Sequence, residues 1–383
     1  METSAERILT THVGSLPRPP ALFDLLLGRE HGEAVDEAKL ADSVTEAVAA
    51  VVARQVETGL DVVGDGEMGK ISYATYLKDR LDGFGGRSEK GPAARDLLDY
   101  RDFAHRLVEA GGTEKTLAGA ACDGPLSVKD PGVLARDIEN FENARAASDP
   151  VEGFLTACSP GVVTIFLQNQ YYPSHAAYLD ALAAILKDEY EAIVASGAVL
   201  QIDCPDLAMG RHLVHARKST AEFRKVAAQH IEVLNEATAA IPPERMRIHL
   251  CWGNYEGPHH YDLALEDIVD LVYRARPQAI SFEAANPRHA HEWEVFEAKK
   301  LPDDRIIVPG VIDSTSNFIE HPRLVAQRIG RFAALVGRER VIAGADCGFA
   351  TFAEHPSVDP EIAWAKLGAL VEGARIASDA LWG

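Results

Sequence analysis

Residues 177–203 read AYLDALAAILKDEYEAIVASGAVLQID, and this stretch combines a helical pattern with that of a buried strand. Its apolar side chains recur at the spacing of one helix face, which indicates an amphipathic helix. These side chains are Leu179, Leu182, Leu186, Tyr190 and Ile193. Gly197 then supplies a C-cap, and the apolar run Val199–Ile202 follows as a strand. A helix that leads into an apolar strand is the repeating unit of a parallel α/β fold.

The same alternation continues in both directions along the chain. Eight parallel strands close a (β/α)8 (TIM) barrel, which is the α/β fold that we expect. The alternative is a doubly wound open sheet, but no G-x-G-x-x-G motif follows the first strand to support its dinucleotide-binding version. Apolar runs of strand length predict the eight strands at Ile8–Val13, Asp61–Gly64, Val162–Leu167, Val199–Ile202, Met246–Leu250, Ala279–Phe282, Arg305–Pro309 and Val341–Ala343.

One segment interrupts the alternation. Residues 77–160 are charged and glycine-rich, with DGFGG at 82–86. We interpret this segment as an excursion after the second strand, with a hairpin around Thr116–Cys122 and one or two helices. Residues 1–383 are then expected to form a single barrel domain that carries this excursion.

Composition and charge narrow the choice of partners. The chain has 38 Lys+Arg against 58 Asp+Glu, a net charge of −20, which argues against nucleic acid or an anionic membrane surface. No apolar run is long enough to span a bilayer, and residues 1–7 do not resemble a secretory signal. Five scattered cysteines do not suggest a disulfide framework. We expect a cytoplasmic protein that acts on small molecules. The sequence is compatible with a homo-oligomer.

The motif His249-Leu250-Cys251 ends the fifth predicted strand. Side chains two apart on a strand share a face, so this imidazole and thiol would both face the barrel axis, a ligand pair suited to zinc. Taken alone, such a motif is more often a buried cysteine beside a hydrogen-bonded histidine. However, Glu283 and Cys347 follow the sixth and eighth strands, whose ends meet the fifth at one rim of a barrel. We therefore predict a zinc site of His249, Cys251, Glu283 and Cys347, suited to a substrate thiol.

Polar residues end other predicted strands as well. Ser15 and Glu67 follow the first and second strands, Asp203 follows the fourth, and Asp313 follows the seventh. Each of them, taken singly, is equally well explained as a helix cap or turn residue. Because all would lie at the same rim, we interpret them together as part of a site for a small organic ligand.

In this order, the motifs resemble the catalytic C-terminal barrel of cobalamin-independent methionine synthase. The resemblance implies a zinc ion, held by His249, Cys251, Glu283 and Cys347, that activates an acceptor thiol for alkylation. It also implies an amino-acid acceptor site at Ser15, Glu67 and Asp203, where the two carboxylates hold an ammonium group. The segments that carry it span nearly the whole chain: TTHVGSLP at 10–17, GDGE at 64–67, QID at 201–203, HLC at 249–251, SFE at 281–283, PGVID at 309–313 and ADCG at 345–348.

Two features depart from the family pattern. The full synthase has an additional N-terminal barrel, for which these 383 residues leave no room. The family also places a histidine two residues after the aspartate that corresponds to Asp313, where it is thought to protonate the departing folate. Here Ser314-Thr315-Ser316 follow, and the nearest histidine is His321. Asp313 and His321 are therefore our candidate catalytic acids, and we expect methyl-folate to be a poor donor.

These observations predict a zinc-dependent enzyme that transfers an alkyl group, most simply methyl, from a small donor to a small thiol. One alternative is thiol addition to an epoxide, as in epoxyalkane:coenzyme M transferase, a short single-barrel relative with a His-x-Cys…Cys zinc site. An alternative of another class is a zinc-free barrel resembling uroporphyrinogen decarboxylase. A zinc-storage protein is disfavoured because carboxylates at several strand ends indicate an organic ligand.

Overall fold

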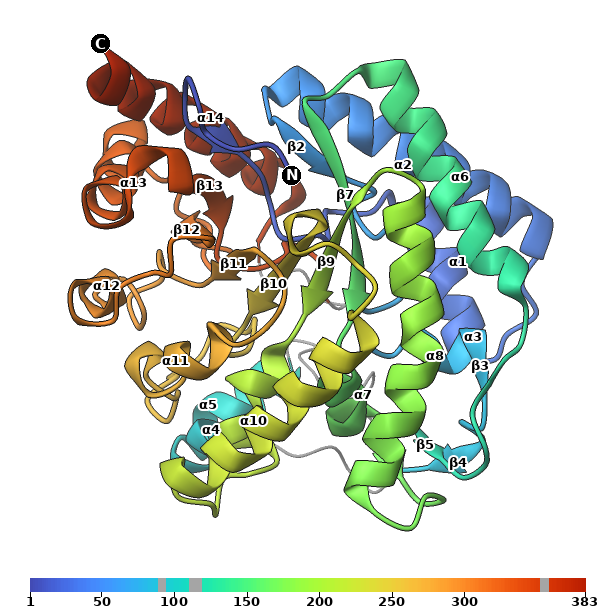
Figure 1. Cartoon of the computed structure of the whole chain (residues 1–383). Helices are drawn as coiled ribbons and strands as arrows, with labels where there is room; N and C mark the ends of the chain where they lie inside the picture. Colours follow the sequence, from blue (N-terminus) through green and yellow to red (C-terminus); the bar gives the residue numbers. More distant parts are fainter. Residues whose placement is uncertain (89–93, 110–118, 352–357) are drawn as a thin grey trace.

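The computed structural model describes residues 1–88, 94–109, 119–351 and 358–383. Eight parallel strands form one sheet in the order β1-β13-β12-β11-β10-β9-β7-β2, and a bridge between Thr11 and Val62 joins its two ends (Figure 1). The predicted (β/α)8 barrel is therefore confirmed. Its strands are β1 (Leu9–Thr10), β2 (Val62–Gly64), β7 (Glu152–Cys158), β9 (Val199–Asp203), β10 (Met246–Leu250), β11 (Ala279–Phe282), β12 (Ile306–Ile312) and β13 (Ile342–Ala345).

Helices pack around the outside of this sheet (Figure 1). Within the described ranges, no helix combines the length and apolar character needed to cross a membrane. The α-helices are α1 (Pro20–Glu30), α2 (Glu37–Thr58), α3 (Leu77–Arg80), α4 (Arg95–Asp99), α5 (Arg101–Glu109), α6 (Pro131–Ser148), α7 (Pro160–Phe166), α8 (His175–Ala195), α9 (Gly210–Leu213), α10 (Thr220–Ala237), α11 (Val269–Val272), α12 (Val295–Ala298), α13 (Pro322–Val336) and α14 (Pro360–Trp382). Short 3-10 helices lie at Pro205–Leu207, Pro243–Arg245, Leu265–Asp267, Glu292–Glu294 and Arg338–Arg340.

The helix-to-strand unit at 177–203 forms as its sequence predicts. Helix α8 begins after Ser174, whose Oγ accepts a hydrogen bond from the amide of Ala177. The chain then turns at Gly197, where φ is +95°, a conformation that favours glycine, and enters β9.

The third predicted strand is wrong. Residues 162–167 lie mostly in α7, which starts at Pro160 and is capped by the Oγ of Ser159. The strand at this point of the barrel is β7, Glu152–Cys158, which pairs with β2 and β9. The β-branched residues of α7 imitate a strand because this short helix is buried on nearly every side, so its sequence lacks an amphipathic period.

The segment between β2 and β7 contains α3 to α6 and two small antiparallel strand pairs. Strand β3 (Leu81–Asp82) pairs with β6 (Ser127–Val128), and β4 (Gly86–Arg87) pairs with β5 (Ala120–Cys122). Strand β8 (Gln168–Asn169), which follows α7, adds to β5 in parallel. The hairpin expected around Thr116–Cys122 lies partly outside the described residues. The barrel resumes at β7, within the range 77–160 assigned to the excursion.

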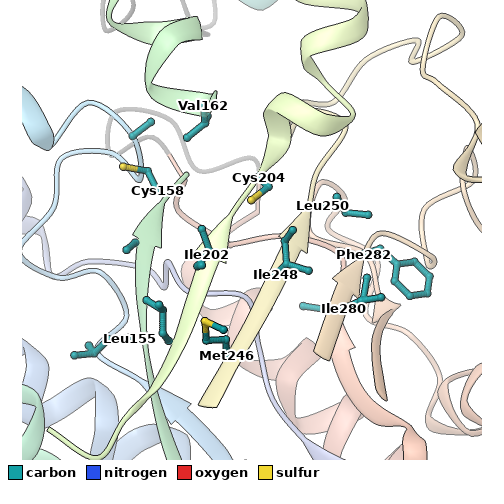
Figure 2. Packing of buried hydrophobic residues seen from close by; sticks show 14 of the residues in the cluster. Leu155, Cys158, Val162, Ile202, Cys204, Met246, Ile248, Leu250, Ile280 and Phe282 are labelled. Atoms are coloured by element: carbon teal, nitrogen blue, oxygen red, sulfur yellow. The ribbon is translucent and has the colours of Figure 1, made fainter. Parts of the chain in front are cut away.

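Alternation along the strands separates the apolar core from the barrel interior. Figure 2 shows Ile202, Ile248 and Ile280 on adjacent strands, where they lie in register and belong to the core shared with the helices. Residues one position away face the opposite side of the sheet. On that side Arg247 reaches across the interior to the hydroxyl of Thr11. His249 has the same parity as Arg247 and therefore also faces the axis.

Candidate metal and substrate site

Three predicted metal ligands meet at the carboxyl ends of the strands. The side chains of His249 (in β10), Cys251 (just after β10) and Cys347 (just after β13) place their ligand atoms within 4.8 Å of one another, and all three residues are buried. The two sulfur atoms are 3.6 Å apart, and neither cysteine is in a disulfide. We call these residues the His/Cys/Cys cluster.

The orientation of His249 is suited to binding a metal. Its Nδ1 lies 3.1 Å from the Oγ of Ser281, its register partner on β11, while its buried Nε2 has no hydrogen-bond partner among the described residues. Burial, assisted by the nearby Arg247, lowers the pKa of His249 to about 3, so the imidazole is neutral. A neutral imidazole with one tethered nitrogen and one free buried nitrogen has the form of a zinc ligand.

The two thiols complete a soft donor set. The hydrogen bond with Cys347 and then burial raise the pKa of Cys251 well above its usual value. In addition, two thiolates this close would repel each other. A divalent cation between them would remove that repulsion. One imidazole and two thiols are the donors that zinc prefers, so the residues of the His/Cys/Cys cluster fit this metal.

Glu283 lies beside the His/Cys/Cys cluster but is not part of it. It follows β11 and is buried, and its Oε1 accepts a hydrogen bond of 2.8 Å from the backbone amide of Trp252. Its Oε2 accepts a hydrogen bond of 2.8 Å from the side chain of Asn286. The structure therefore brings together three of the four predicted ligands and holds the fourth by other groups.

Asp346, to which the sequence assigned no role, positions the loop after Glu283. Its two carboxylate oxygens accept three backbone hydrogen bonds, from Ala284 and Ala285 at 2.8 Å and from Asn286 at 2.7 Å. A Cβ at Gly310 would lie 2.0 Å from Oδ1 of Asp346, so this approach requires glycine. Its position next to Cys347 was the signal that could have revealed this role.

The predicted acceptor residues converge on the neighbouring strand ends. Glu67 is buried, with one oxygen bonded to the hydroxyl of Thr156 and the other without a partner among the described residues. Asp203 is the register partner of His249 on β9. Burial, and then the charge of Glu67, raise the pKa of Asp203 to about 8. The effect of Glu67 on Asp203 indicates that the two carboxylates share one electrostatic environment.

Ser15 adjoins the loop that carries Cys347. Its carbonyl oxygen accepts a hydrogen bond of 2.8 Å from the amide of Phe349, and its Oγ accepts one of 3.3 Å from the amide of Ala350. A Cβ at Gly348 would lie 2.1 Å from that Oγ. The predicted acceptor residue Ser15 and the predicted ligand Cys347 are thus held together through their loops.

The two candidate acids have different environments. Asp313 is buried after β12, and its Oδ1 accepts hydrogen bonds of 2.9 Å from the amide and the hydroxyl of Thr315. His321 is exposed and serves as the N-cap of α13, where its Nδ1 accepts a hydrogen bond from the amide of Arg323. The structure therefore commits the imidazole of His321 to a helix terminus.

A polar bridge joins the Asp313 loop to the loop of Cys347. The hydroxyl of Ser314 donates to Oδ1 of Asn254 at 3.1 Å, and Nδ2 of Asn254 donates to the carbonyl of Gly348 at 2.7 Å. Asn254 lies three residues after Cys251, so it links the strand ends of β10, β12 and β13. Sequence analysis did not single out Asn254.

Two histidines near Glu283 were also missed: His289, which is buried, and His259, which is half-buried. The ring nitrogens of His289 lie 2.8 Å from Glu292 and 3.1 Å from Asp262. Since both nitrogens face carboxylates, both carry protons, and these partners raise the pKa of His289 to about 10 despite burial. His259, bonded to Asp262 and a carbonyl, has its pKa raised to about 9 despite desolvation. Burial raises the pKa of Glu283, and the two imidazolium charges partly offset this effect. The sequence signal of each histidine was a carboxylate three residues later.

The excursion holds the loop that follows Cys251. Oδ2 of Asp96, in α4, accepts hydrogen bonds of 2.6 Å from the hydroxyl of Tyr255 and 2.8 Å from the amide of His259. Nε2 of His260 lies 3.0 Å from Oδ2 of Asp99. Helix α4 therefore anchors the chain between the His/Cys/Cys cluster and these two histidines.

Together, these features define a (β/α)8-barrel enzyme site with soft metal ligands and paired carboxylates at the carboxyl ends of the strands. The chain belongs to the family of the cobalamin-independent synthase catalytic domain, whose model matches residues 129–374. It is thus a methionine synthase-like, cobalamin-independent methyltransferase, and the resemblance found in the sequence is confirmed.

Relatives match over nearly their whole length. The methionine synthase of Saccharolobus solfataricus is 22% identical over 386 residues, which cover 97% of this chain and 95% of the relative. The methionine synthase of Sulfolobus acidocaldarius is 25% identical over 374 residues, with 97% and 93% covered. The structure of a B12-independent methionine synthase from Shewanella sp. W3-18-1, in complex with selenomethionine, has the same fold, with a TM-score of 0.74, 19% identity, and 98% and 99% covered.

Proposed function

We propose that this protein is a zinc-dependent enzyme that transfers a methyl group to the thiol of a small amino-acid acceptor of the homocysteine type. The observation that carries the proposal is the His/Cys/Cys cluster, which lies at the strand ends of a barrel of this family. Beside it, Glu67 and Asp203 supply the negative charge that an amino-acid acceptor would neutralise.

His249, Cys251 and Cys347 would hold the zinc ion, with Glu283 as a labile fourth ligand. When bound, zinc keeps a substrate thiol deprotonated and nucleophilic at neutral pH. Ser281 fixes the imidazole of His249 through Nδ1, and Trp252 and Asn286 hold Glu283 close by. Displacement of Glu283 from the metal would cost little, because these two donors would still satisfy its oxygens.

Glu67 and Asp203 would bind the ammonium group of the acceptor, with Ser15 completing that site. Buried carboxylates are costly, and the nearby cations Lys70 and Arg247 still leave the pKa of Asp203 raised to about 8, chiefly by burial. A bound ammonium would offset the remaining cost and explains their pairing better than an apolar ligand does. The negative charge of this pair also argues against the addition of a sulfonate-bearing thiol to an epoxide, because Glu67 and Asp203 would repel the sulfonate. The zinc-free decarboxylase alternative does not explain why two thiols and an imidazole lie together in the His/Cys/Cys cluster.

The proposal is tested by metal analysis of the purified protein followed by X-ray absorption at the zinc edge with a panel of thiols. We expect one zinc per chain and one additional sulfur neighbour when homocysteine is added. Homoserine, which has a hydroxyl in place of the thiol, is the matched control and should leave the sulfur count unchanged. A sulfur count that no thiol in the panel alters would refute direct activation of the acceptor.

The donor should be one whose leaving group needs little protonation. Methyl-tetrahydrofolate requires a positioned acid, but His321 is exposed at the N-cap of α13, which leaves Asp313 as the candidate. We expect weak turnover with methyl-tetrahydrofolate and faster turnover with methylcobalamin. His321→Ala should change turnover by less than about twofold and should lower stability by roughly 1 kcal/mol through loss of the helix cap. Robust folate turnover that His321→Ala abolishes would instead identify His321 as the acid.

A further inference from the structure

Lys70 is a buried cation that sequence analysis did not notice. It is 6% exposed, and its Nζ donates to the carbonyl of Thr156 at 2.6 Å and to the hydroxyl of Thr156 at 3.0 Å. Its Nζ also lies 4.6 Å from the centre of the Tyr76 ring. The ammonium group therefore connects to the Glu67 carboxylate through Thr156.

The chemistry of these groups sets the direction of each hydrogen bond. An ammonium can only donate, so Oγ1 of Thr156 accepts from Lys70. The single proton of that hydroxyl is then free to point to Oε1 of Glu67, 3.0 Å away. Oε1 is thereby occupied as an acceptor, and Oε2 is the buried oxygen of Glu67 that has no partner among the described residues.

The chain around Glu67 is tightly packed. Its φ is +56°, an uncommon value for a residue other than glycine, and Arg18 donates to its carbonyl oxygen at 2.9 Å. A Cβ at Gly14 would lie 2.7 Å from Oε1, so the chain just after β1 packs closely against this carboxylate. Uncommon backbone conformations of this kind cluster at functional sites.

Asp203 is supported in the same way by a second cation. Arg247, which can only donate, gives a hydrogen bond of 2.7 Å from Nε to Oε1 of Gln201. The amide group of Gln201 is thereby oriented, and its Nε2 donates to Oδ1 of Asp203 at 2.7 Å. Each carboxylate of the acceptor site is therefore bonded to a neutral side chain that a buried cation orients.

We propose that Lys70–Thr156 and Arg247–Gln201 are two positioning relays that hold Glu67 and Asp203 as one-sided acceptors for the ammonium group of the substrate. They set the specificity of the enzyme for thiols that carry an amino group, over thiols of the same length without one. This inference rests on the proposed function, because it takes the acceptor to be an aminothiol. The buried cations offset part of the carboxylate repulsion but do not replace the ligand, since Lys70 is bonded to Thr156, and Arg247 to Gln201, Thr11 and His12.

The experiment compares homocysteine with 4-mercaptobutanoate, which is homocysteine without its amino group, on zinc-loaded full-length protein. Thr156→Val removes the hydroxyl that donates to Glu67, and Lys70→Met removes the ammonium that orients this hydroxyl. We expect either variant to raise the KM for homocysteine by about 5- to 30-fold, which is less than the loss of a direct hydrogen bond to a charged group because Glu67 itself remains in place. The KM for 4-mercaptobutanoate and both kcat values should change less than about twofold, since neither involves the ammonium. Thr156→Ser should restore the wild-type ratio.

Thr238→Val is the matched control. This hydroxyl is equally buried, but it donates to the carbonyl of Leu234 within α10, away from the site. It should lower stability slightly and leave the ratio of the two KM values unchanged. Zinc content and melting temperature of every variant exclude loss of metal or fold as the cause.

The outcomes separate the relay from the proposed function. If Thr156→Val and Lys70→Met are folded and keep the wild-type preference for homocysteine, the relay has no positioning role and the inference is overturned. If the wild-type protein coordinates both thiols at zinc without preferring homocysteine, the amino-acid acceptor itself is wrong, and the inference falls with it. If Thr156→Val and Lys70→Met lose the preference for homocysteine and Thr156→Ser keeps it, the result supports both the relay and the amino-acid acceptor.

Discussion

Replacement of Cys347 by alanine is expected to abolish stoichiometric zinc binding and to lower methyl transfer by more than about 100-fold. Loss of a residue that merely orients a ligand typically costs 10- to 100-fold in metal affinity or activity, so loss of a direct ligand should cost more. The substitution leaves only one imidazole and one thiol of the His/Cys/Cys cluster, and Glu283 is already bonded to Trp252 and Asn286. Metal analysis of the purified variant and a competition titration with a chromogenic chelator measure the effect.

Cys204→Ala is the matched control for this prediction. Cys204 is a free, buried cysteine just after β9, and it belongs to the core rather than to the His/Cys/Cys cluster. Its replacement should retain one zinc per chain and near-normal turnover. Full zinc occupancy and unchanged affinity in Cys347→Ala would show that the metal site is elsewhere.

Glu67→Gln should raise the KM for homocysteine by roughly 10- to 150-fold, which corresponds to about 1.5–3 kcal/mol for a hydrogen bond to a charged group. Oε2 of Glu67, which has no partner in the described part of the chain, is the oxygen that an ammonium would meet, and the amide substitution removes its charge. Because the lost contact binds the ground state and the transition state equally, kcat should fall much less than KM rises. Steady-state kinetics with saturating donor give both constants.

The acceptor without an amino group provides the internal control for Glu67→Gln. The KM for 4-mercaptobutanoate should stay constant or decrease, since it carries no cation to lose. If a sulfonate-bearing thiol such as 2-mercaptoethanesulfonate were the best acceptor of the wild-type protein, the carboxylates would not be an ammonium site. That result would favour the epoxide-opening chemistry instead.

The imidazolium groups of His259 and His289 add positive charge near Glu283. They share Asp262, and their charges partly offset the rise that burial causes in the pKa of Glu283. If zinc binds as proposed, two thiolates, a carboxylate and an incoming thiolate would surround it with a large negative charge. These cations would offset part of that charge without being ligands.

Local sequence determined the barrel and the residues at its rim. Alternate residues of a strand share one face, so the spacing of His249 and Cys251 already placed both on the axis side. Parallel strands end at the same rim, which grouped Cys347, Glu67 and Asp203 with them before any contact was known. Local periodicity failed at α7, where burial on nearly every side removes the amphipathic pattern and β-branched residues imitate a strand.

Only the tertiary structure decided which of these groups touch. Glu283 is separated from the His/Cys/Cys cluster by its bonds to Trp252 and Asn286, and His321 is used by the helix that it caps. Lys70 and Thr156 are 86 positions apart, so no local pattern links them. Sequence periodicity records which face of an element a residue occupies, whereas a hydrogen-bond partner depends on how distant strands are brought into register and on which polar atoms burial leaves unsatisfied.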